Sequence, residues 1–224
     1  MLSLSRILER LAEVHGEPAP PPSRALLDLV LFENVAYLVD DERRSLAFRD
    51  LQTKVGVRPE QILAASEEAL VAAAGQGILA QSQATKLREI ARRAVDEFDG
   101  NLESIRSLPV AQAKKALMRF PSIGEPGAEK ILLFSRSHAV LGLDSNGVRV
   151  LTRLGVVQDA KTYAATYRAV QAAVSPYAGE GFDWLIRAHQ LLRQHGQDLC
   201  RRTQPRCDRC PLNDSCAYYA AVSR

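Results

Sequence analysis

The sequence predicts an all-α protein. Along nearly all of the 224-residue chain, apolar side chains recur with the 3.6-residue period of a helix that buries one face. No segment keeps the period-2 alternation of a half-buried strand. Prolines and glycines mark where several of these helical stretches begin or end.

The expected helices of the N-terminal half can be placed in order. A first amphipathic helix is expected near residues 4–11, and the proline-rich connector at 17–22 ends it. Ser23 is expected to cap a buried helix over residues 26–39. Pro59 is expected to begin the next helix, because proline is tolerated in the first helical turn.

The remaining helices follow from the same spacing of apolar residues. One clear stripe ends at Asp99-Gly100, and the expected ranges are 87–98, 110–120, 128–135, 163–174 and 185–192.

Size, charge and composition limit the class of protein. The chain is long enough for one large domain or two small ones. Its longest apolar run, from Leu26 to Phe32, is interrupted by Asp28 and is far shorter than a membrane span of about 20 residues. The formal net charge is +3, which is compatible with nucleic-acid binding but weak evidence for it. The first residues lack the apolar core of a signal peptide, so we expect an intracellular protein.

The segment LMRFPSIGEPGA, residues 117–128, lies between two helical patterns. Gly124 permits a positive φ and a close approach of the backbone to another surface. Pro126 suits the opening turn of the following helix. Free N–H groups at that helix start can bind an anion such as a DNA phosphate, although a plain helix–helix connection is the alternative interpretation.

Asp144 lies in the segment LGLDSNGVRVLTRLG. An aspartate before Ser145 and Asn146 can simply cap a helix. A carboxylate placed there can also stabilise a positive charge that develops during a reaction on DNA.

Four cysteines lie together near the C-terminus, at Cys200, Cys207, Cys210 and Cys216, and they are the only cysteines of the chain. Four thiolates can hold a tetrahedral zinc ion or a [4Fe-4S] cluster, or can form two disulfides. The unequal spacing C-x6-C-x2-C-x5-C favours the cluster over zinc, and disulfides suit secreted chains.

Together these motifs resemble the endonuclease III family of helix-hairpin-helix DNA glycosylases. The cysteine spacing around QPRCDRCP resembles the [4Fe-4S] loop of that family, and FPSIGEPGA resembles its hairpin, which usually reads L-P-G-x-G. LDSNGVRV resembles the segment with the essential aspartate, and GILAQSQATKL, residues 77–87, resembles a loop that approaches DNA.

The resemblance implies a helix-hairpin-helix glycosylase fold in two parts. Residues 23–138 would form a six-helix barrel domain with the hairpin at about 117–134. Residues 1–22 and 139–224 would form the helical iron–sulfur domain, with damaged or mismatched double-stranded DNA in the cleft between the two and the target base flipped out. We expect a monomer in the cytoplasm of a prokaryote, associated with the nucleoid.

The resemblance also assigns residues to roles. Asp144 would activate water or stabilise the oxocarbenium character of the sugar as the base leaves. DNA contacts would come from the hairpin and from two amides near the flipped base, namely Ser122, Ile123, Gly124, Gly127, Asn34 and Gln81. The candidate phosphate contacts of the cysteine loop would be Arg201, Arg202, Arg206 and Arg209, unless these form an ordinary solvated face.

The chain departs from the family at the residue that carries its lyase chemistry. Pro126 stands where bifunctional members have a lysine that attacks the sugar C1′, so we expect hydrolysis of the N-glycosidic bond with weak or no lyase activity. Lys130, one turn later, is a possible replacement. Leu29 falls where adenine-specific relatives have a catalytic glutamate, which disfavours that specificity.

Two other functions stay open at this point. A protein that has lost catalysis and binds abasic or distorted DNA would explain the departures at Pro126, Ser122 and Leu29. An iron–sulfur electron carrier would leave the hairpin and Asp144 unexplained. Tyr37 and His138 are candidate pocket residues, although core packing explains each of them equally well.

Overall fold

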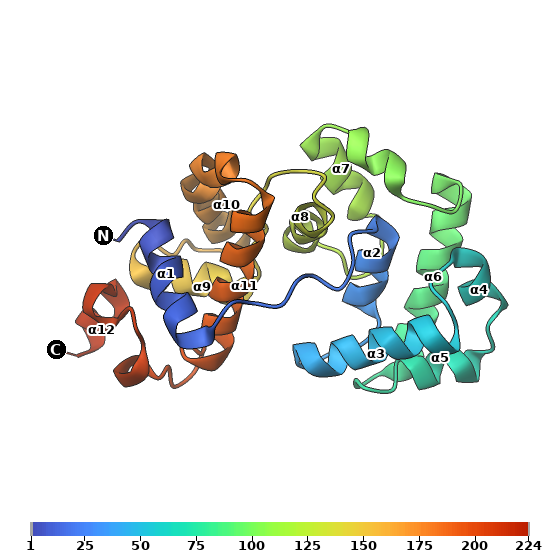
Figure 1. The fold of residues 1–224 in the computed structure, drawn as a ribbon, viewed down its shortest axis with the longest axis horizontal. Coiled ribbons are helices and arrows are strands. Elements are labelled where there is room, and N and C mark those ends of the chain that lie inside the picture. The colour runs from blue at the N-terminus through green and yellow to red at the C-terminus, as the bar shows by residue number, and fades with distance from the viewer. Residues whose placement is uncertain (1, 224) are drawn as a thin grey trace. The chain divides into compact units, whose positions relative to one another are not determined.

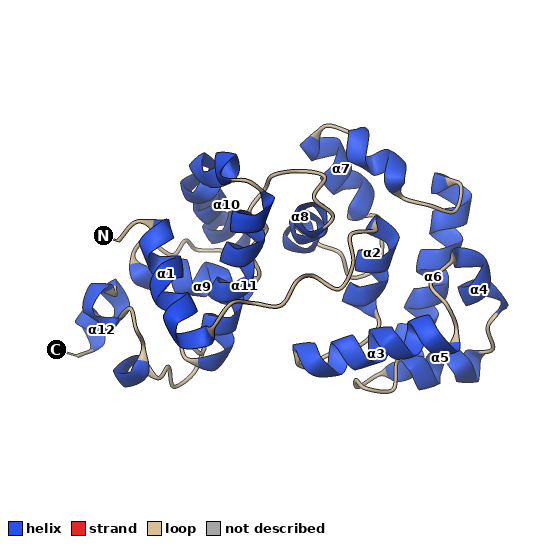
Figure 2. Cartoon of the chain, viewed as in Figure 1, coloured by secondary structure: helices blue, strands red, loops and turns tan. Residues whose placement is uncertain are grey.

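The computed structural model describes residues 2–223, and in that range it is built from helices joined by loops (Figures 1 and 2). The described residues contain no strand, only an isolated bridge between Tyr37 and Ile78. The all-α prediction is therefore confirmed. No helix in the described range is long and apolar enough to cross a membrane.

The α-helices are α1 (Leu4–His15), α2 (Leu26–Asn34), α3 (Asp41–Lys54), α4 (Pro59–Ala64), α5 (Glu67–Ala73), α6 (Ala80–Phe98), α7 (Val110–Leu117), α8 (Glu125–Phe134), α9 (Ser145–Leu154), α10 (Tyr163–Val174), α11 (Phe182–Asp198) and α12 (Ala217–Val222). Short 3-10 helices η1 (Glu103–Ser107), η2 (Ser175–Glu180), η3 (Cys207–Arg209) and η4 (Asn213–Ser215) lie between them.

The chain divides into two compact units. The terminal unit consists of Met1–Pro20 and Ala139–Arg224, and the central unit of Pro21–His138. The first therefore holds Asp144 and the four cysteines, and the second holds the hairpin segment. That the terminal unit is an iron–sulfur domain and the central unit a six-helix barrel domain stays a prediction.

The central unit is organised around α6, which packs against α2, α4 and α5. Leu87, Ile90, Ala91 and Ala94 of α6 are fully buried, so the apolar stripe expected there forms part of the core. Val95 of the same expected stripe is 40% exposed and lies at its edge. The hairpin helices α7 and α8 pack against each other, and α8 also packs against α2.

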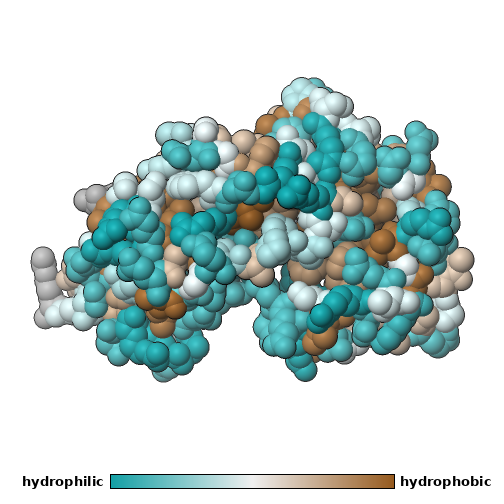
Figure 3. Space-filling model, in the orientation of Figure 1, coloured by the Kyte–Doolittle hydropathy of each residue, from teal (hydrophilic) through white to brown (hydrophobic). Residues whose placement is uncertain are grey.

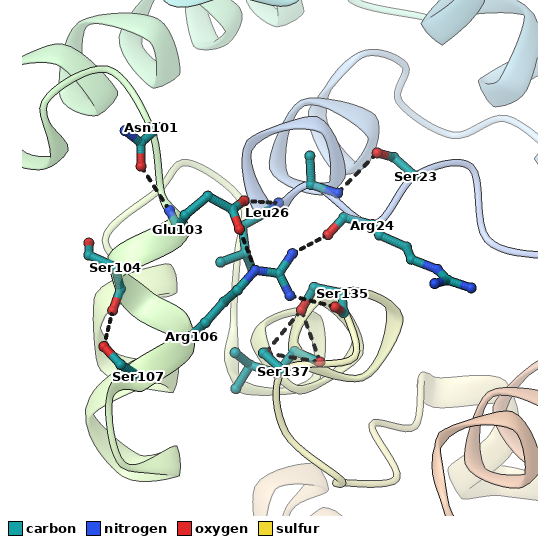
Figure 4. A network of polar contacts seen from close by, with 12 residues as sticks. Ser23, Arg24, Leu26, Asn101, Glu103, Ser104, Arg106, Ser107, Ser135 and Ser137 are labelled. Atoms are coloured by element: carbon teal, nitrogen blue, oxygen red, sulfur yellow. Dashed lines mark hydrogen bonds and ion pairs between the residues drawn. The ribbon is translucent and has the colours of Figure 1, made fainter.

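Arg106 of η1 ties three segments of the central unit together (Figure 4). Its guanidinium donates to the carbonyls of Arg24, before α2, and Ser135, at the end of α8, each at 2.6 Å. It also forms an ion pair with Glu103. Because the last carbonyls of a helix lack intrahelical donors, this contact satisfies a free acceptor at the end of α8 and ties it to the start of α2.

The terminal unit is organised around α11, which packs against α1 and α9. The predicted apolar face of α1 is buried, with Leu8 and Leu11 at 0% exposure. At the α9–α11 contact, a Cβ on Gly196 would lie 2.7 Å from the Cβ of Asn146. Only glycine therefore lets the end of α11 approach the start of α9 this closely.

The helix α2 of the central unit differs from expectation at its N-cap and at its end. The buried helix α2 begins after Ala25 and ends at Asn34 instead of reaching residue 39, and Ser23 is not its N-cap. The Ser23 hydroxyl instead donates to Asp28 and accepts from the Ala25 N–H.

The sequence patterns did not indicate α3 and α5. Most residues of α3 are polar, and only Ala47, Phe48 and Leu51 are buried, so its apolar period is weak. Its clearest signal is the N-cap Asp40, whose side chain accepts from the Arg43 N–H at 2.8 Å.

Hydrophilic residues cover most of the face seen in Figure 3, with hydrophobic ones in separate smaller areas.

Candidate active site and cysteine pocket

Asp144 is the N-cap of α9, and its carboxylate accepts four hydrogen bonds. One oxygen, Oδ1, accepts from the backbone N–H groups of Asn146 and Gly147, both at 2.9 Å. The other, Oδ2, accepts from the Asn146 side chain at 2.9 Å and from Arg193 at 2.8 Å. The start of α9 and an arginine of α11 therefore hold the carboxylate in one orientation.

The surroundings of Asp144 keep it ionised. Burial by itself would raise the pKa of this carboxyl, but the positive charges of His189 and Arg193 and the hydrogen bonds from Gly147 and Asn146 outweigh it, so the pKa lies below its ordinary value. Its side chain is still 22% exposed. Asp144 is thus a fixed negative charge that retains access to solvent.

Tyr163 is a neighbour of Asp144 that the sequence patterns placed only on an apolar helix face. Its side chain begins α10 and is half exposed. Burial of the phenol and the negative charge of Asp144 both raise the pKa of Tyr163, so it stays a neutral hydroxyl. Helical spacing could not identify it, because its closeness to Asp144 arises only from the packing of α10 on α9.

The hairpin differs from expectation in the residue that takes the left-handed conformation. Ser122 has a φ of 59°, whereas Gly124 has a φ of −91° and a ψ of −178°, which is extended backbone. The Ser122 hydroxyl accepts from Lys86 at 3.0 Å. Pro126 lies in the first turn of α8 as predicted. Since the first N–H groups of a helix have no intrahelical acceptor, those of Glu125 and Gly127 are available to an anion.

We expect Ser122→Gly to stabilise the protein relative to Ser122→Ala by about 1 kcal/mol. Both variants lose the hydroxyl that contacts Lys86, but only glycine relieves the left-handed backbone conformation. Denaturant unfolding of the two variants measures the difference. Equal stabilities would show that this backbone conformation carries no strain.

Lys130 is already engaged in the central unit. Its ammonium lies 2.6 Å from a carboxylate oxygen of Glu33, and the two side chains are only 15% and 16% exposed. Arg44 also approaches the same oxygen, at 3.6 Å. This pairing favours a structural role for Lys130 over that of a free amine nucleophile.

The two amides expected to contact DNA occupy different environments. Asn34 is 1% exposed, and its amide donates to the carbonyls of Val30 and Pro121, so it is a buried brace between α2 and the hairpin. Its burial and these two hydrogen bonds favour the bracing role, and the expectation that it fills the gap left by a flipped base stays a prediction. Gln81 is exposed on α6 but donates to Glu67.

Two exposed leucines occupy the tips of neighbouring loops in the same unit. Leu38 is 70% exposed and Leu79 is 60% exposed, and both have positive φ, at 53° and 60°. The bridge between Tyr37 and Ile78 joins the two loops directly beside these leucines. Large apolar residues in this conformation are uncommon and often belong to functional sites. The sequence signal was present at Leu79, inside the GILAQSQATKL segment, but nothing indicated Leu38.

Gly77 makes this loop pairing possible. A Cβ on Gly77 would lie 2.7 Å from the backbone nitrogen and 2.9 Å from the carbonyl oxygen of Tyr37. Any other residue would therefore push the two loops apart.

The two candidate pocket residues lie in different environments. Tyr37 is 45% exposed. The ring nitrogen Nε2 of His138 is hydrogen-bonded to the carbonyl of Leu108 at 2.8 Å.

All four cysteines line one pocket of the terminal unit, together with Arg153, Leu199, Asn213, Tyr218 and Tyr219. All four are free and partly buried. Arg10 of α1 reaches this loop, donating to the carbonyl of Pro211 and the carboxylate of Asp214. The basic residues expected to face phosphates, Arg201, Arg202, Arg206 and Arg209, are all exposed.

The thiols of this pocket influence one another. Burial, and to a lesser extent the negative charges of Cys200, Cys216 and Cys207, raise the pKa of Cys210 to about 11 despite a hydrogen bond from the Leu212 backbone. Four thiolates are therefore unfavourable here without a bound cation. Among residues 2–223, no group of three or more His, Cys, Asp or Glu side chains could hold a metal ion as placed.

Comparisons with known proteins give related sequences and the same fold. No family model matches the chain. The chain is 26% identical over 182 residues to an Endonuclease III of Sulfolobus acidocaldarius, covering 80% of this chain and 76% of the relative. It is 24% identical over 220 residues to an Endonuclease III of Rickettsia conorii, covering 96% and 97%.

Two solved structures share the architecture. A non-covalent endonuclease III–DNA complex matches with a TM-score of 0.76 at 18% identity, over the full length of both chains. A thermostable thymine-DNA glycosylase matches with a TM-score of 0.76 at 17% identity, covering 97% of this chain and 95% of that one.

Proposed function

We propose that this chain, which belongs to an endonuclease III-like family of helix-hairpin-helix DNA glycosylases, removes a damaged or mismatched base from duplex DNA by hydrolysis and leaves an abasic site. The observation that carries the proposal is Asp144, an ionised carboxylate held by four donors at the start of α9. A DNA glycosylase of base excision repair needs such a charge beside the sugar whose bond to the base breaks.

The geometry of Asp144 favours an electrostatic role over that of a proton acceptor. When the N-glycosidic bond breaks, the base leaves with the bonding electrons and positive charge develops at C1′. A nearby negative charge stabilises that state without moving. The carboxylate already accepts four hydrogen bonds and has a lowered pKa, so it is a weak base. Water then adds to C1′ and releases its proton to solvent or to the departing base.

The hairpin is proposed to bind a backbone phosphate. The N–H groups at the start of α8 point at an anion by helix geometry, and the helix dipole adds to their attraction. Glu125 in the same turn would oppose this, but its carboxylate is paired with Lys114 at 2.7 Å. Ser122, Ile123, Gly124 and Gly127 remain the proposed contacts, with Lys86 close to Ser122.

Two residues support hydrolysis without strand cleavage. Proline at position 126 has no side-chain nucleophile, and Lys130 is paired with Glu33 inside the central unit. We therefore propose a monofunctional enzyme.

We propose that Leu38 and Leu79 insert between bases as apolar wedges. Proteins that distort DNA often use leucine in this way, at a cost in base stacking that their other contacts offset. Their exposure and left-handed backbone place both side chains at loop tips.

Leu79→Ala and Leu38→Ala are each expected to slow base release by about tenfold or more, because extrusion of the base loses its wedge. Stability should change little, since both side chains are exposed. Leu63→Ala, at a leucine that is 36% exposed on α4, is the matched control and should leave turnover unchanged. Single-turnover assays compare the three variants. Full activity in the double variant of Leu38 and Leu79 would contradict the wedge role.

We propose that Cys200, Cys207, Cys210 and Cys216 hold a [4Fe-4S] cluster. The chemistry of the donors fits, since four free thiols line one pocket and such clusters take four cysteine thiolates. When bound, the cluster would neutralise the thiolates and brace the loop that carries the four exposed arginines.

The test is a base-release assay on duplexes with oxidised pyrimidines, uracil, G·T mismatches and alkylated bases, each with and without alkali. Release of one base class that yields strand breaks only after alkali supports the proposal. Tight binding of abasic or distorted duplexes with no release from any substrate would favour a binding protein that has lost catalysis.

A further inference from the structure

A row of side chains in the terminal unit leads from one cysteine of the pocket to the surface. His195 Nε2 lies 3.4 Å from the sulfur of Cys210, and its Nδ1 lies 3.1 Å from His15 Nε2. His15 Nδ1 lies 3.7 Å from a carboxylate oxygen of Asp198. His195 is 1% exposed, whereas the Asp198 side chain is 54% exposed.

The contacts determine which ring nitrogens carry protons when Cys210 is a metal-bound thiolate. A thiolate only accepts hydrogen bonds, so His195 Nε2 must carry the proton that faces it. In neutral His195 the other ring nitrogen, Nδ1, is then an acceptor, and His15 Nε2 must donate to it. The function of His15 in this row is to hold His195 in the donating tautomer, as outer-shell groups do for histidines at metal sites.

A second donor faces another sulfur of the same pocket. Arg153 Nη1 lies 3.5 Å from the sulfur of Cys200, and the guanidinium lies 4.5 Å from the ring centre of Tyr218. Arg153 also donates to the carbonyls of Arg201 and Arg202, which fixes its position. Two of the four sulfurs thus face an N–H donor held by the surrounding protein.

We propose that His195, oriented by His15, donates a hydrogen bond to the Cys210 thiolate and, together with Arg153, raises the reduction potential of an iron–sulfur cluster in this pocket. This inference rests on the cofactor part of the proposed function. Hydrogen bonds and positive charge at the sulfurs stabilise the more negative, reduced state, and they are among the features that set the potential of such clusters. His195 and His15 are positioning residues in this scheme and take no part in base release.

The experiment is a redox titration of the full-length protein with its cluster, comparing the unchanged protein with His195→Leu, His195→Gln and His15→Leu. At a fixed potential, His195→Leu is expected to lower the ratio of reduced to oxidised cluster by about tenfold, equivalent to about 59 mV for one electron. His195→Gln keeps an N–H donor and should restore part of the loss. His15→Leu should shift the ratio in the same direction by a smaller factor.

His138→Leu is the matched control. Of the four histidines of the chain, His138 is the one in the central unit, whereas the cysteine pocket belongs to the terminal unit. This variant should leave the potential unchanged. Pulsed EPR of the reduced unchanged protein with 15N-labelled histidine should show a nitrogen coupled to the cluster, and the coupling should vanish in His195→Leu.

The possible failures are distinguishable. Absence of iron and sulfide from the purified protein would overturn the cofactor assignment and this inference with it, while leaving base release by Asp144 untouched. An unchanged potential in His195→Leu with full iron content would overturn the hydrogen-bond role alone. If His195→Leu does not retain its cluster, the potential of His15→Leu is the deciding measurement. The hydrogen bond of His15 is to His195 and not to a cysteine. An unchanged potential in His15→Leu would then overturn the inference.

Discussion

Replacing Asp144 by asparagine is expected to slow base release by about 10²–10³-fold while binding of the duplex persists. Asparagine keeps a side-chain oxygen that can accept from the N–H groups of Asn146 and Gly147, so the cap of α9 largely survives. The negative charge that we propose to face the sugar is lost. Single-turnover kinetics, on the substrate found by the duplex panel, measure the rate of base release. A gel-shift or anisotropy titration measures binding of the duplex.

Asp40→Asn is the matched control for this prediction. Asp40 also caps a helix, accepting from the Arg43 N–H at the start of α3, but it is exposed and belongs to the central unit. Asp40→Asn should change the cap of its helix as Asp144→Asn does, but it should leave turnover unchanged. Thermal unfolding monitored by circular dichroism confirms that each variant is folded at the assay temperature. Turnover of Asp144→Asn within a few-fold of the unchanged protein would refute the catalytic role.

Pro126→Lys is expected to give the proposed monofunctional enzyme a strand-cleaving activity. A lysine in the first turn of α8 supplies an amine that can attack C1′ as the base leaves, forming an imine that borohydride traps as a covalent protein–DNA complex. The start of a helix also disfavours the protonated ammonium and so favours the reactive neutral amine. Denaturing gel electrophoresis after borohydride treatment detects the complex.

The controls separate the amine from the loss of proline. Pro126→Gln removes the ring without adding a nucleophile and should trap nothing. A trapped complex in the unchanged protein that disappears in Lys130→Gln would mean that Lys130 leaves Glu33 to act as the nucleophile. That result would contradict a monofunctional enzyme and leave the glycosylase assignment intact.

Local patterns were sufficient for much of the fold. The apolar faces of α1 and α6 and the Asp99-Gly100 stop were predicted because each depends on the spacing of residues within one helix. The polar helix α3 was not predicted, since three buried residues leave too weak a period. The end of α2 was missed for a related reason, because apolar residues continue beyond Asn34 into a loop whose burial is set by tertiary packing.

The candidate site shows the same division between local and tertiary information. The sequence by itself determined the residue types of the candidate site and the cysteine pocket, because the spacing of the cysteines, the aspartate at a helix start and the proline in the hairpin are all short-range features. Only the tertiary structure decided which side chains are accessible and how they are paired. It buried Asn34, exposed Leu38 and Leu79, paired Lys130 with Glu33, and brought His195 and His15 to Cys210. These contacts join residues far apart in the chain, so no local pattern records them.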